Sequence, residues 1–311
     1  MLQIDGLDEG LEIFKCLGSE VRMGIVEQLA QNDGMNLNEL ASALKLTNGA
    51  LTSHIRKLEE CGIIQVTSAH TGRGTQKICS LNVDQLLLNV YPAVEERSTK
   101  VYETSVRIGQ FSDYSVKPSC GIAGADALIG TEDDPRCFSW PERLEAEMIW
   151  LHDGFLEYRI PNLLPEKQCI VQVTLSFELI AADTGPDGMT QSDVSFFLNG
   201  RDVGHWVTFP DTDRTRGIHT PAWWDRKVRQ HGFLKMLVIN QGGAFLDGVK
   251  IADTGIDFPF LDDAGEMKLR LEAHPKEGSE GGLAVFGSGF GNYRQDIHAR
   301  VHYMPEEILN G

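Results

Sequence analysis

The chain has 311 residues, with 28 lysines and arginines against 45 aspartates and glutamates, and a formal net charge of −17 at pH 7. This length allows two domains with separate cores. No apolar run reaches membrane length and no signal-peptide pattern opens the sequence, so we expect a cytoplasmic protein without a membrane partner. The six cysteines lie apart, without a Cys-x-x-Cys pair, which predicts reduced thiols.

The first elements along the chain are helices. Apolar residues recur at helical spacing over residues 14–29, and Gly18-Ser19 separates them into two segments. A third apolar helix is predicted to end near Leu44. The start of the chain therefore predicts a small helical bundle.

A fourth helix follows a short turn, and the Thr47 hydroxyl is placed to cap it. Its predicted core face consists of Leu51, Ile55 and Leu58, which recur at i, i+4 and i+7. Its opposite face carries small residues, hydroxyls and an arginine, namely Gly49, Thr52, Ser53 and Arg56. Such a face allows close approach to a DNA major groove and offers hydrogen bonds to bases and phosphates.

A hairpin is predicted after this helix. Residues 63–68 and 77–81 are β-prone, and the Gly-bounded tip at 69–75 carries Arg73. Residues 45–81 include five basic and two acidic residues, which give a local net charge of +3. Because salt screens charges over roughly 8–10 Å, this local patch can decide contact with DNA despite the acidic total.

These residues resemble the ArsR-type winged helix repressors, most closely at 17–25 and 51–64, and the resemblance spans about residues 8–82. It implies a winged helix-turn-helix transcriptional regulator that binds a double-stranded DNA operator as a homodimer. The family carries a longer dimerisation helix after the wing. Here residues 84–90 predict only a short helix, which Pro92 ends, so the usual dimer contact is in doubt.

We expect the DNA contacts to come from the fourth helix and the wing tip. The predicted DNA-binding residues are Asn48, Gly49, Thr52, Ser53, His54, Arg56, Lys57 and Arg73. Most of them would enter the major groove, whereas Lys57 would contact phosphate and Arg73 the backbone or minor groove. Asn38-Glu39-Leu40 occupies the region where metal-sensing members of the family carry paired cysteines, so no metal is expected.

The sequence changes character after Leu81. We expect a DNA-binding domain at 1–90, a linker at 91–100 and an all-β domain at 101–311. The predicted strands alternate apolar and polar residues, and they include residues 171–179, 267–271 and 297–303, with hairpins at Asn199-Gly200 and Asp247-Gly248. Short strands with Gly-rich turns predict a β-sandwich or jelly roll. The fold class is therefore a multidomain α+β protein.

Residues 196–206 resemble the strand–Asn-Gly–strand unit of galactose-binding-like sandwich domains, the carbohydrate-binding modules attached to many glycosidases. This resemblance is one hairpin long. It implies a β domain that binds a carbohydrate. A DNA reader joined to such a domain is most simply a repressor whose β domain senses a mono- or disaccharide effector.

The segment 205–225 is the candidate ligand site, because it holds three of the five tryptophans among charged residues. Stacking platforms and hydroxyl partners are expected from His205, Trp206, Asp211, Asp213, Arg214, Arg216, His219, Trp223 and Trp224. A second interpretation stays open, in which this is a structural loop and Trp223 and Trp224 fill the core.

Two other roles stay open for the β domain. It could serve only in dimerisation, or it could be a glycosidase-like enzyme that uses carboxylates such as Asp211, Asp213 and Asp225 beside His219. No nucleophile or metalloprotease motif accompanies these residues, so we expect no enzyme and no catalytic residues. The segment 287–291 lacks the strand–helix context of a dinucleotide loop, and no cofactor is expected.

Overall fold

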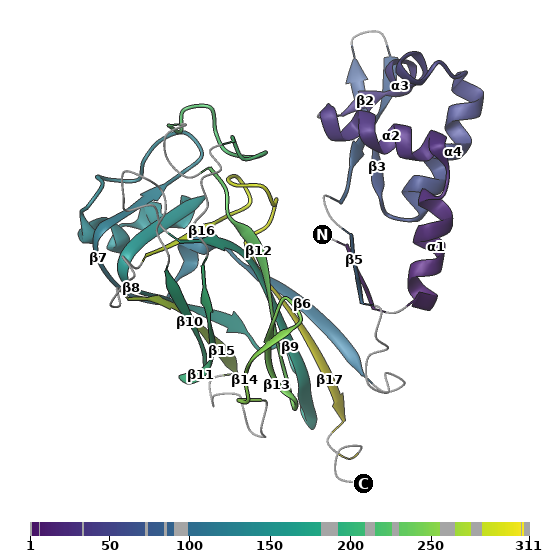
Figure 1. The fold of residues 1–311 in the computed structure, drawn as a ribbon. Helices are drawn as coiled ribbons and strands as arrows, with labels where there is room; N and C mark the ends of the chain where they lie inside the picture. The colour runs from purple at the N-terminus through teal and green to yellow at the C-terminus, as the bar shows by residue number, and fades with distance from the viewer. Residues whose placement is uncertain are drawn as a thin grey trace. The chain divides into compact units, whose positions relative to one another are not determined.

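The computed structural model (Figure 1) describes residues 2–5, 7–32, 34–71, 74–83, 86–89, 99–181, 192–208, 215–225, 230–255, 265–274, 282–305 and 307. The chain divides into two compact units, Met1–Glu96 and Arg97–Gly311. Within the described ranges, no helix is both long enough and apolar enough to cross a bilayer.

The N-terminal unit combines helices with short strands (Figure 1). Its elements are β1 (Leu2–Asp5), α1 (Leu7–Leu17), α2 (Glu20–Gln31), β2 (Met35–Asn36), α3 (Leu37–Leu44), α4 (Asn48–Glu60), β3 (Ile64–Thr71), β4 (Gly74–Leu81) and β5 (Leu86–Asn89). The antiparallel hairpin β3–β4 is the predicted wing, and β2 extends it to a three-stranded sheet in the order β2-β4-β3. The four helices predicted before the wing, and the wing hairpin itself, are confirmed.

The start of α3 is fixed by a reciprocal capping box. The Asn36 side chain accepts the backbone N–H groups of Asn38 and Glu39 at 2.9 and 3.0 Å, and the Glu39 carboxylate accepts the Asn36 N–H at 2.7 Å. The start of α4 has the predicted cap, since Thr47 Oγ1 accepts the Ala50 N–H at 3.3 Å. Both caps satisfy N–H groups that a helix start leaves without an intrahelical acceptor.

The N-terminal core lies under α4. Leu51 and Leu58 are fully buried and Ile55 is nearly so, which confirms the predicted core face of this helix. The same cluster contains Ile25 of α2 and Leu40 of α3. The core therefore fixes α4 with its opposite, polar face outward.

The short helix predicted at 84–90 is wrong where the structure describes it, because Leu86–Asn89 forms strand β5. This strand pairs in parallel with β1, and Leu2 lies opposite Leu86. A short apolar run fits a strand and a helix equally well, and here the partner strand at the start of the chain decides between them. Leu88 packs against α1, since a Cβ on Gly10 would lie 3.2 Å from its Cδ1.

The C-terminal unit is built from strands with short 3₁₀ turns. Its elements are β6 (Lys100–Val106), η2 (Ile108–Gln110), β7 (Asp113–Ala123), η3 (Pro135–Ser139), η4 (Pro141–Glu145), β8 (Met148–Pro161), β9 (Gln168–Ile180), β10 (Asp193–Leu198), β11 (Arg201–Val207), β12 (Phe233–Asn240), β13 (Gly243–Leu246), β14 (Val249–Ala252), β15 (Glu266–Ala273), β16 (Leu283–Phe286) and β17 (Ile297–Pro305). The predicted all-β fold is confirmed.

The strands form two layers. One layer runs β11-β10-β15-β8-β7 and the other runs β6-β17-β9-β12-β13-β14, while β16 pairs with both β8 and β9. The two ends of this strand order meet, because β11 contacts β14 and β13. The folded sheet thereby encloses one large apolar core, to which both layers contribute buried side chains.

Both predicted two-residue hairpins are present. Asn199 and Gly200 have φ angles of 48° and 75°, and Asp247 and Gly248 have φ angles of 51° and 83°. Two successive positive φ angles are the geometry of the type I′ turn, which Asn-Gly and Asp-Gly favour.

Strand β9 is less exposed than its alternation predicts. Thr174, Ser176 and Glu178 occupy the predicted solvated face, yet all three are buried. Ser176 Oγ accepts a hydrogen bond from Gln295 Nε2 at 3.1 Å. Glu178 accepts backbone N–H groups from a segment near β12 and from the loop before β17. The prediction of a half-buried strand is therefore wrong, because distant segments cover the second face.

Candidate nucleic-acid interface and ligand surface

The outward face of α4 is polar and exposed. Its exposed residues include the predicted set Asn48, Gly49, Thr52, Ser53, Arg56 and Lys57. Asn48 Nδ2 donates to Asn38 Oδ1 at 2.7 Å, which ties the start of α4 to α3. Thr52 Oγ1 and Ser53 Oγ donate back to carbonyls of their own helix at 2.7 and 3.0 Å. In this state the two hydroxyls are left with acceptor lone pairs for an external partner.

Arg56 has a partner that the sequence reasoning did not assign to it. Its Nε donates to Glu60 Oε1 at 2.8 Å, and both side chains are mostly exposed. The i, i+4 spacing of opposite charges on a helix is the signal that could have indicated this pair. The contact occupies one edge of the guanidinium and leaves its two terminal nitrogens for other acceptors.

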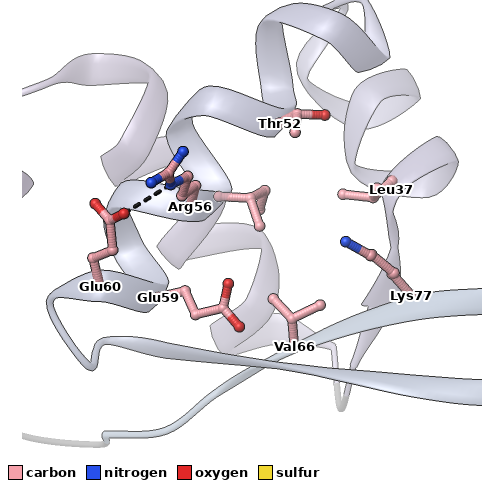
Figure 2. Close-up of a pocket in the computed structure, with 8 residues that line it drawn as sticks. Leu37, Thr52, Arg56, Glu59, Glu60, Val66 and Lys77 are labelled. Carbon is pink, nitrogen blue, oxygen red and sulfur yellow. Dashed lines mark hydrogen bonds and ion pairs between the residues drawn. The ribbon is translucent and has the colours of Figure 1, made fainter.

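A cavity of about 370 Å³ lies between α4, the start of α3 and the wing hairpin (Figure 2). It is lined by Leu37, Thr52, Ile55, Arg56, Glu59, Glu60, Val66 and Lys77. The lining brings two cations and two carboxylates together around apolar side chains. The two carboxylates would repel a phosphate group at this cavity, whereas Arg56 and Lys77 would attract one.

The remaining predicted DNA contacts differ in position. Lys57 is exposed, whereas His54 is half-buried at the edge of the core face of α4. The buried His54 Nδ1 has no hydrogen-bond partner within the part of the chain that the structure describes. Arg73 lies outside the described residues.

Helix α1 exposes an apolar stripe. Leu7, Leu11 and Phe14 recur at i, i+4 and i+7, and about half of each side chain is accessible. Leu86 of β5 is exposed to a similar degree. A stripe of this kind on a helix favours packing against another apolar surface.

In the C-terminal unit, the two adjacent tryptophans of the candidate ligand segment differ in how far their side chains are exposed. Trp224 is 6% exposed, and its ring packs edge-on against Trp150 and Phe290, with centroids 5.7 and 5.3 Å away. Trp224 is therefore a core residue. Trp223 is 37% exposed, and its Nε1 donates to Ala125 O at 2.7 Å.

Arg216 and His219 hold the same segment in shape. Arg216 donates to the carbonyls of Thr220 at 3.2 Å and Trp224 at 3.3 Å, and also to that of Pro221. The His219 backbone N–H donates to Gly291 O at 2.9 Å. The guanidinium thus stabilises the turn that presents Trp223.

Trp206 belongs to another aromatic group. Lys235 Nζ lies 4.2 Å from the centre of its ring and 2.7 Å from Asp247 Oδ2, and Phe233 meets the ring edge-on. One face of Trp206 is thereby occupied by a cation. His205 is exposed on the same strand. The predicted site residues Asp211, Asp213 and Arg214 lie outside the described residues.

The loop that supports Trp224 is anchored on a buried carboxylate. Glu178 accepts the N–H groups of Gly232 at 2.7 Å, Asn292 at 3.0 Å and Tyr293 at 3.0 Å. Burial raises the pKa of Glu178 to about 7, and the three backbone N–H groups oppose that rise. Sequence reasoning missed Glu178, because alternation placed it on a solvated face.

The family comparison agrees with the fold of the N-terminal unit. The family model of the winged helix DNA-binding domain matches residues 21–83. No curated protein sequence matches the chain. Among the solved structures that resemble parts of the chain, a transcriptional regulator homologue protein from Pyrococcus horikoshii OT3 is 30% identical, with 22% of this chain and 68% of that chain covered and a TM-score of 0.21.

Two further structures complete the comparison. The crystal structure of an ArsR family transcriptional regulator is 22% identical, with 26% of this chain and 76% of that chain covered and a TM-score of 0.21. The CBM36-1 domain of a multidomain xylanase from the hindgut metagenome of Trinervitermes trinervoides is 7% identical, with 64% of this chain and 96% of that chain covered and a TM-score of 0.29. Residues 21–83 therefore form a winged helix DNA-binding domain, which an all-β unit follows in the chain.

Proposed function

We propose that this protein is a transcriptional repressor whose winged helix domain binds an operator and whose β unit senses a sugar or sugar-like metabolite. The observation that carries the proposal is the polar, exposed face of α4 in a domain that matches the winged helix family. In this proposal the protein acts as a regulator, without a catalytic role.

In the proposed complex, Thr52, Ser53 and Arg56 read base edges in the major groove. Asn48 and Gly49 allow the start of α4 to approach the duplex, with His54 at the flank of the contact. Lys57, Lys77 and the wing-tip Arg73 contact phosphates. The exposure of Lys57 and the position of Lys77 in the cavity beside α4 support these roles.

We propose further that the DNA-bound form is a homodimer. A single winged helix offers few contacts, and two recognition helices about one DNA turn apart read a near-palindrome. The exposed stripe of Leu7, Leu11 and Phe14, together with Leu86, supports a contact through α1. This contact would replace the longer helix that ArsR-type repressors carry after the wing.

For the effector, Trp223 is the proposed stacking platform. Its indole is fixed at one edge by the hydrogen bond to Ala125 and packs at 87° against Trp224, 5.4 Å away, so little side-chain entropy remains to be lost on binding. A sugar presents C–H faces to an indole ring and hydroxyls to nearby polar groups. His219 lies four residues before Trp223, and Asp211, Asp213 and Arg214 stay predicted partners.

A second candidate role of this surface is contact with protein. Ile218 is 78% exposed in the same segment as Trp223. Exposed aliphatic and aromatic side chains in one surface segment are typical of protein interfaces. In that case the β unit would contribute to the dimer and would not sense a sugar.

The DNA proposal is tested by a binding titration on the region upstream of the gene, over a range of salt concentrations. Arg56→Ala should weaken operator binding by about 1–3 kcal/mol and relax base preference. Lys57→Ala should weaken all sequences alike and lower the salt slope by about one charge. Lys100→Ala, which removes an exposed cation from β6, is the control and should bind normally. Absence of DNA binding at low salt, with and without sugars, would contradict the proposal.

The sensor proposal is tested by a thermal-shift screen of sugars, followed by calorimetry on each hit. Trp223→Ala should abolish the binding of the hit. Trp140→Ala removes another exposed tryptophan and should leave binding unchanged. If only another class of metabolite raises the melting temperature, the sugar assignment fails. If no small molecule does, protein contact is the better role for this surface.

A further inference from the structure

Two cysteine thiols of the N-terminal unit lie side by side on different helices. Cys16 is on the last turn of α1, and Cys61 is the residue that caps the end of α4. Both are free thiols; Cys16 is buried and Cys61 is partly accessible. The sequence shows only two cysteines far apart in the chain.

The contacts of the two residues are reciprocal. Cys16 Sγ lies 3.5 Å from the carbonyl oxygen of Lys57, which also accepts the Cys61 backbone N–H at 3.1 Å. Cys61 Sγ lies 4.0 Å from the carbonyl oxygen of Glu12, one turn before Cys16 on α1. Each thiol therefore sits against the helical turn that holds the other.

The electrostatic surroundings of Cys16 include the neighbouring Cys61 thiol. Burial raises the pKa of Cys16 to about 11, and the next largest cause is a hydrogen bond with the Cys61 thiol. The charges of Arg22 and Lys57 oppose the rise. Together with the reciprocal contacts to Lys57 and Glu12, this places two free thiols close to each other.

We propose that Cys16 and Cys61 are a peroxide-oxidisable pair whose disulfide ties α1 to the end of α4. The regulatory consequence rests on the function proposed above, because α1 carries the proposed dimer stripe and α4 the proposed DNA contacts. Formation of the disulfide does not depend on that function and can be measured by itself.

The chemistry needs a hydroperoxide as the oxidant. The Cys61 thiolate, the more accessible sulfur, attacks one peroxide oxygen; the O–O bond breaks, a sulfenic acid forms and water leaves after protonation. The Cys16 thiolate then attacks the Cys61 sulfur; the S–O bond breaks, the S–S bond forms and a second water leaves. The two thiols lose two electrons in total, and the peroxide gains them.

The raised pKa of Cys16 sets the pH dependence of the second step. Only the thiolate attacks. At pH values below the pKa of about 11, the rate of disulfide closure should therefore rise about tenfold for each unit by which the pH is raised. The pair should therefore respond slowly at neutral pH. It suits sustained peroxide exposure better than a brief pulse.

The disulfide would also change the geometry of the unit. An S–S bond of about 2.05 Å is shorter than the non-bonded contact of two thiols, so α1 must move toward the end of α4. In a dimer built on α1, that movement changes the spacing of the two recognition helices. We expect at least a fivefold loss of operator affinity on oxidation.

The experiment treats the full-length reduced protein with hydrogen peroxide at pH 7 and pH 9. Intact mass should fall by about two hydrogens, and a proteolytic map under non-reducing conditions should contain a linked Cys16–Cys61 peptide, formed faster at pH 9. Cys61→Ser and Cys16→Ser should each abolish this peptide. Cys120 and Cys137, which lie near each other in the C-terminal unit but are fully buried, serve as internal controls and should stay reduced.

Two results would overturn the inference. One is an oxidised wild-type protein without the linked peptide, for instance with Cys61 over-oxidised and Cys16 still a thiol. The other is a disulfide that leaves operator affinity unchanged, which removes the regulatory role. A reduced protein that binds no DNA but still forms the disulfide would instead contradict the proposed function. The wild-type peptide map remains decisive if a serine variant does not fold.

Discussion

At the scale of single residues, the most informative side chain is Glu178. It is fully buried in β9, and its two oxygens gather backbone N–H groups from two loops that are distant in sequence. A Cβ on Gly291 would lie 2.4 Å from one carboxylate oxygen, so only glycine leaves room for this contact. The carboxylate therefore organises the loop on which Phe290 supports Trp224.

Glu178 should make the stability of the β unit depend on pH. Its folded pKa of about 7 lies above the ordinary value of 4.5, so the folded protein binds this proton more tightly than the unfolded chain. The stabilisation is fully present below pH 4.5 and is lost as the pH rises through 7. The loss amounts to about 3 kcal/mol of unfolding free energy.

The variant Glu178→Gln tests this predicted pH dependence of stability. The amide cannot ionise, and its NH₂ group meets backbone donors, so the variant should be less stable than wild type at pH 5. The difference between the two proteins should shrink by about 2–3 kcal/mol by pH 8, measured by urea unfolding. Glu142→Gln, on an exposed turn, is the control and should show a constant difference. A Glu178→Gln difference independent of pH would refute the assignment.

At the scale of elements, the caps of α3 and α4 position the exposed polar face of α4, the proposed DNA-binding face. Asn36 accepts two backbone N–H groups and completes a box with Glu39, whereas Thr47 accepts one N–H group at a longer distance. The two helices also meet through the Asn38–Asn48 hydrogen bond. A weakened cap should therefore disturb both helices of the motif.

We predict that Asn36→Ala destabilises the N-terminal unit by about 1 kcal/mol and that Thr47→Ala costs less. Ser42→Ala lies on the exposed side of α3 and is the matched control, since alanine favours a helix interior. Thermal unfolding of the full chain, followed by far-UV circular dichroism, gives the ranking. Equal effects of the three substitutions would show that the caps contribute little.

Some of these elements could be predicted from the sequence and others could not. The helices, the wing and the type I′ hairpins at Asn199-Gly200 and Asp247-Gly248 could be predicted, because their signals lie within a few residues. Strand β5 and the second buried face of β9 could not, since their partners lie far away in the chain. In the candidate sites, local composition selected Trp223 and Trp224 together. It could not indicate that Phe290 and Trp150 bury only the second.

At the scale of the whole molecule, the exposed stripe on α1 predicts the oligomeric state. Phe14→Glu places a charge in the proposed contact and should give a monomer, because an unpaired buried charge is costly. Light scattering should report close to twice 34.5 kDa for the wild type and a single chain for the variant. Met23→Glu, at a similarly exposed apolar position on α2, should remain dimeric. A monomeric wild type with full operator affinity would rule out the α1 dimer.

The pairing of β1 with β5 has a mechanical consequence for the chain. β5 is the last described strand of the N-terminal unit before the chain continues to the β unit, and its hydrogen bonds join it to β1 over Leu2–Asp5. A single residue separates β1 from α1. Tension in the connecting chain would load β5 first, then β1 across the strand pair, and then α1. Along this route, the first helix to receive the load is therefore the one that exposes Leu11 and Phe14.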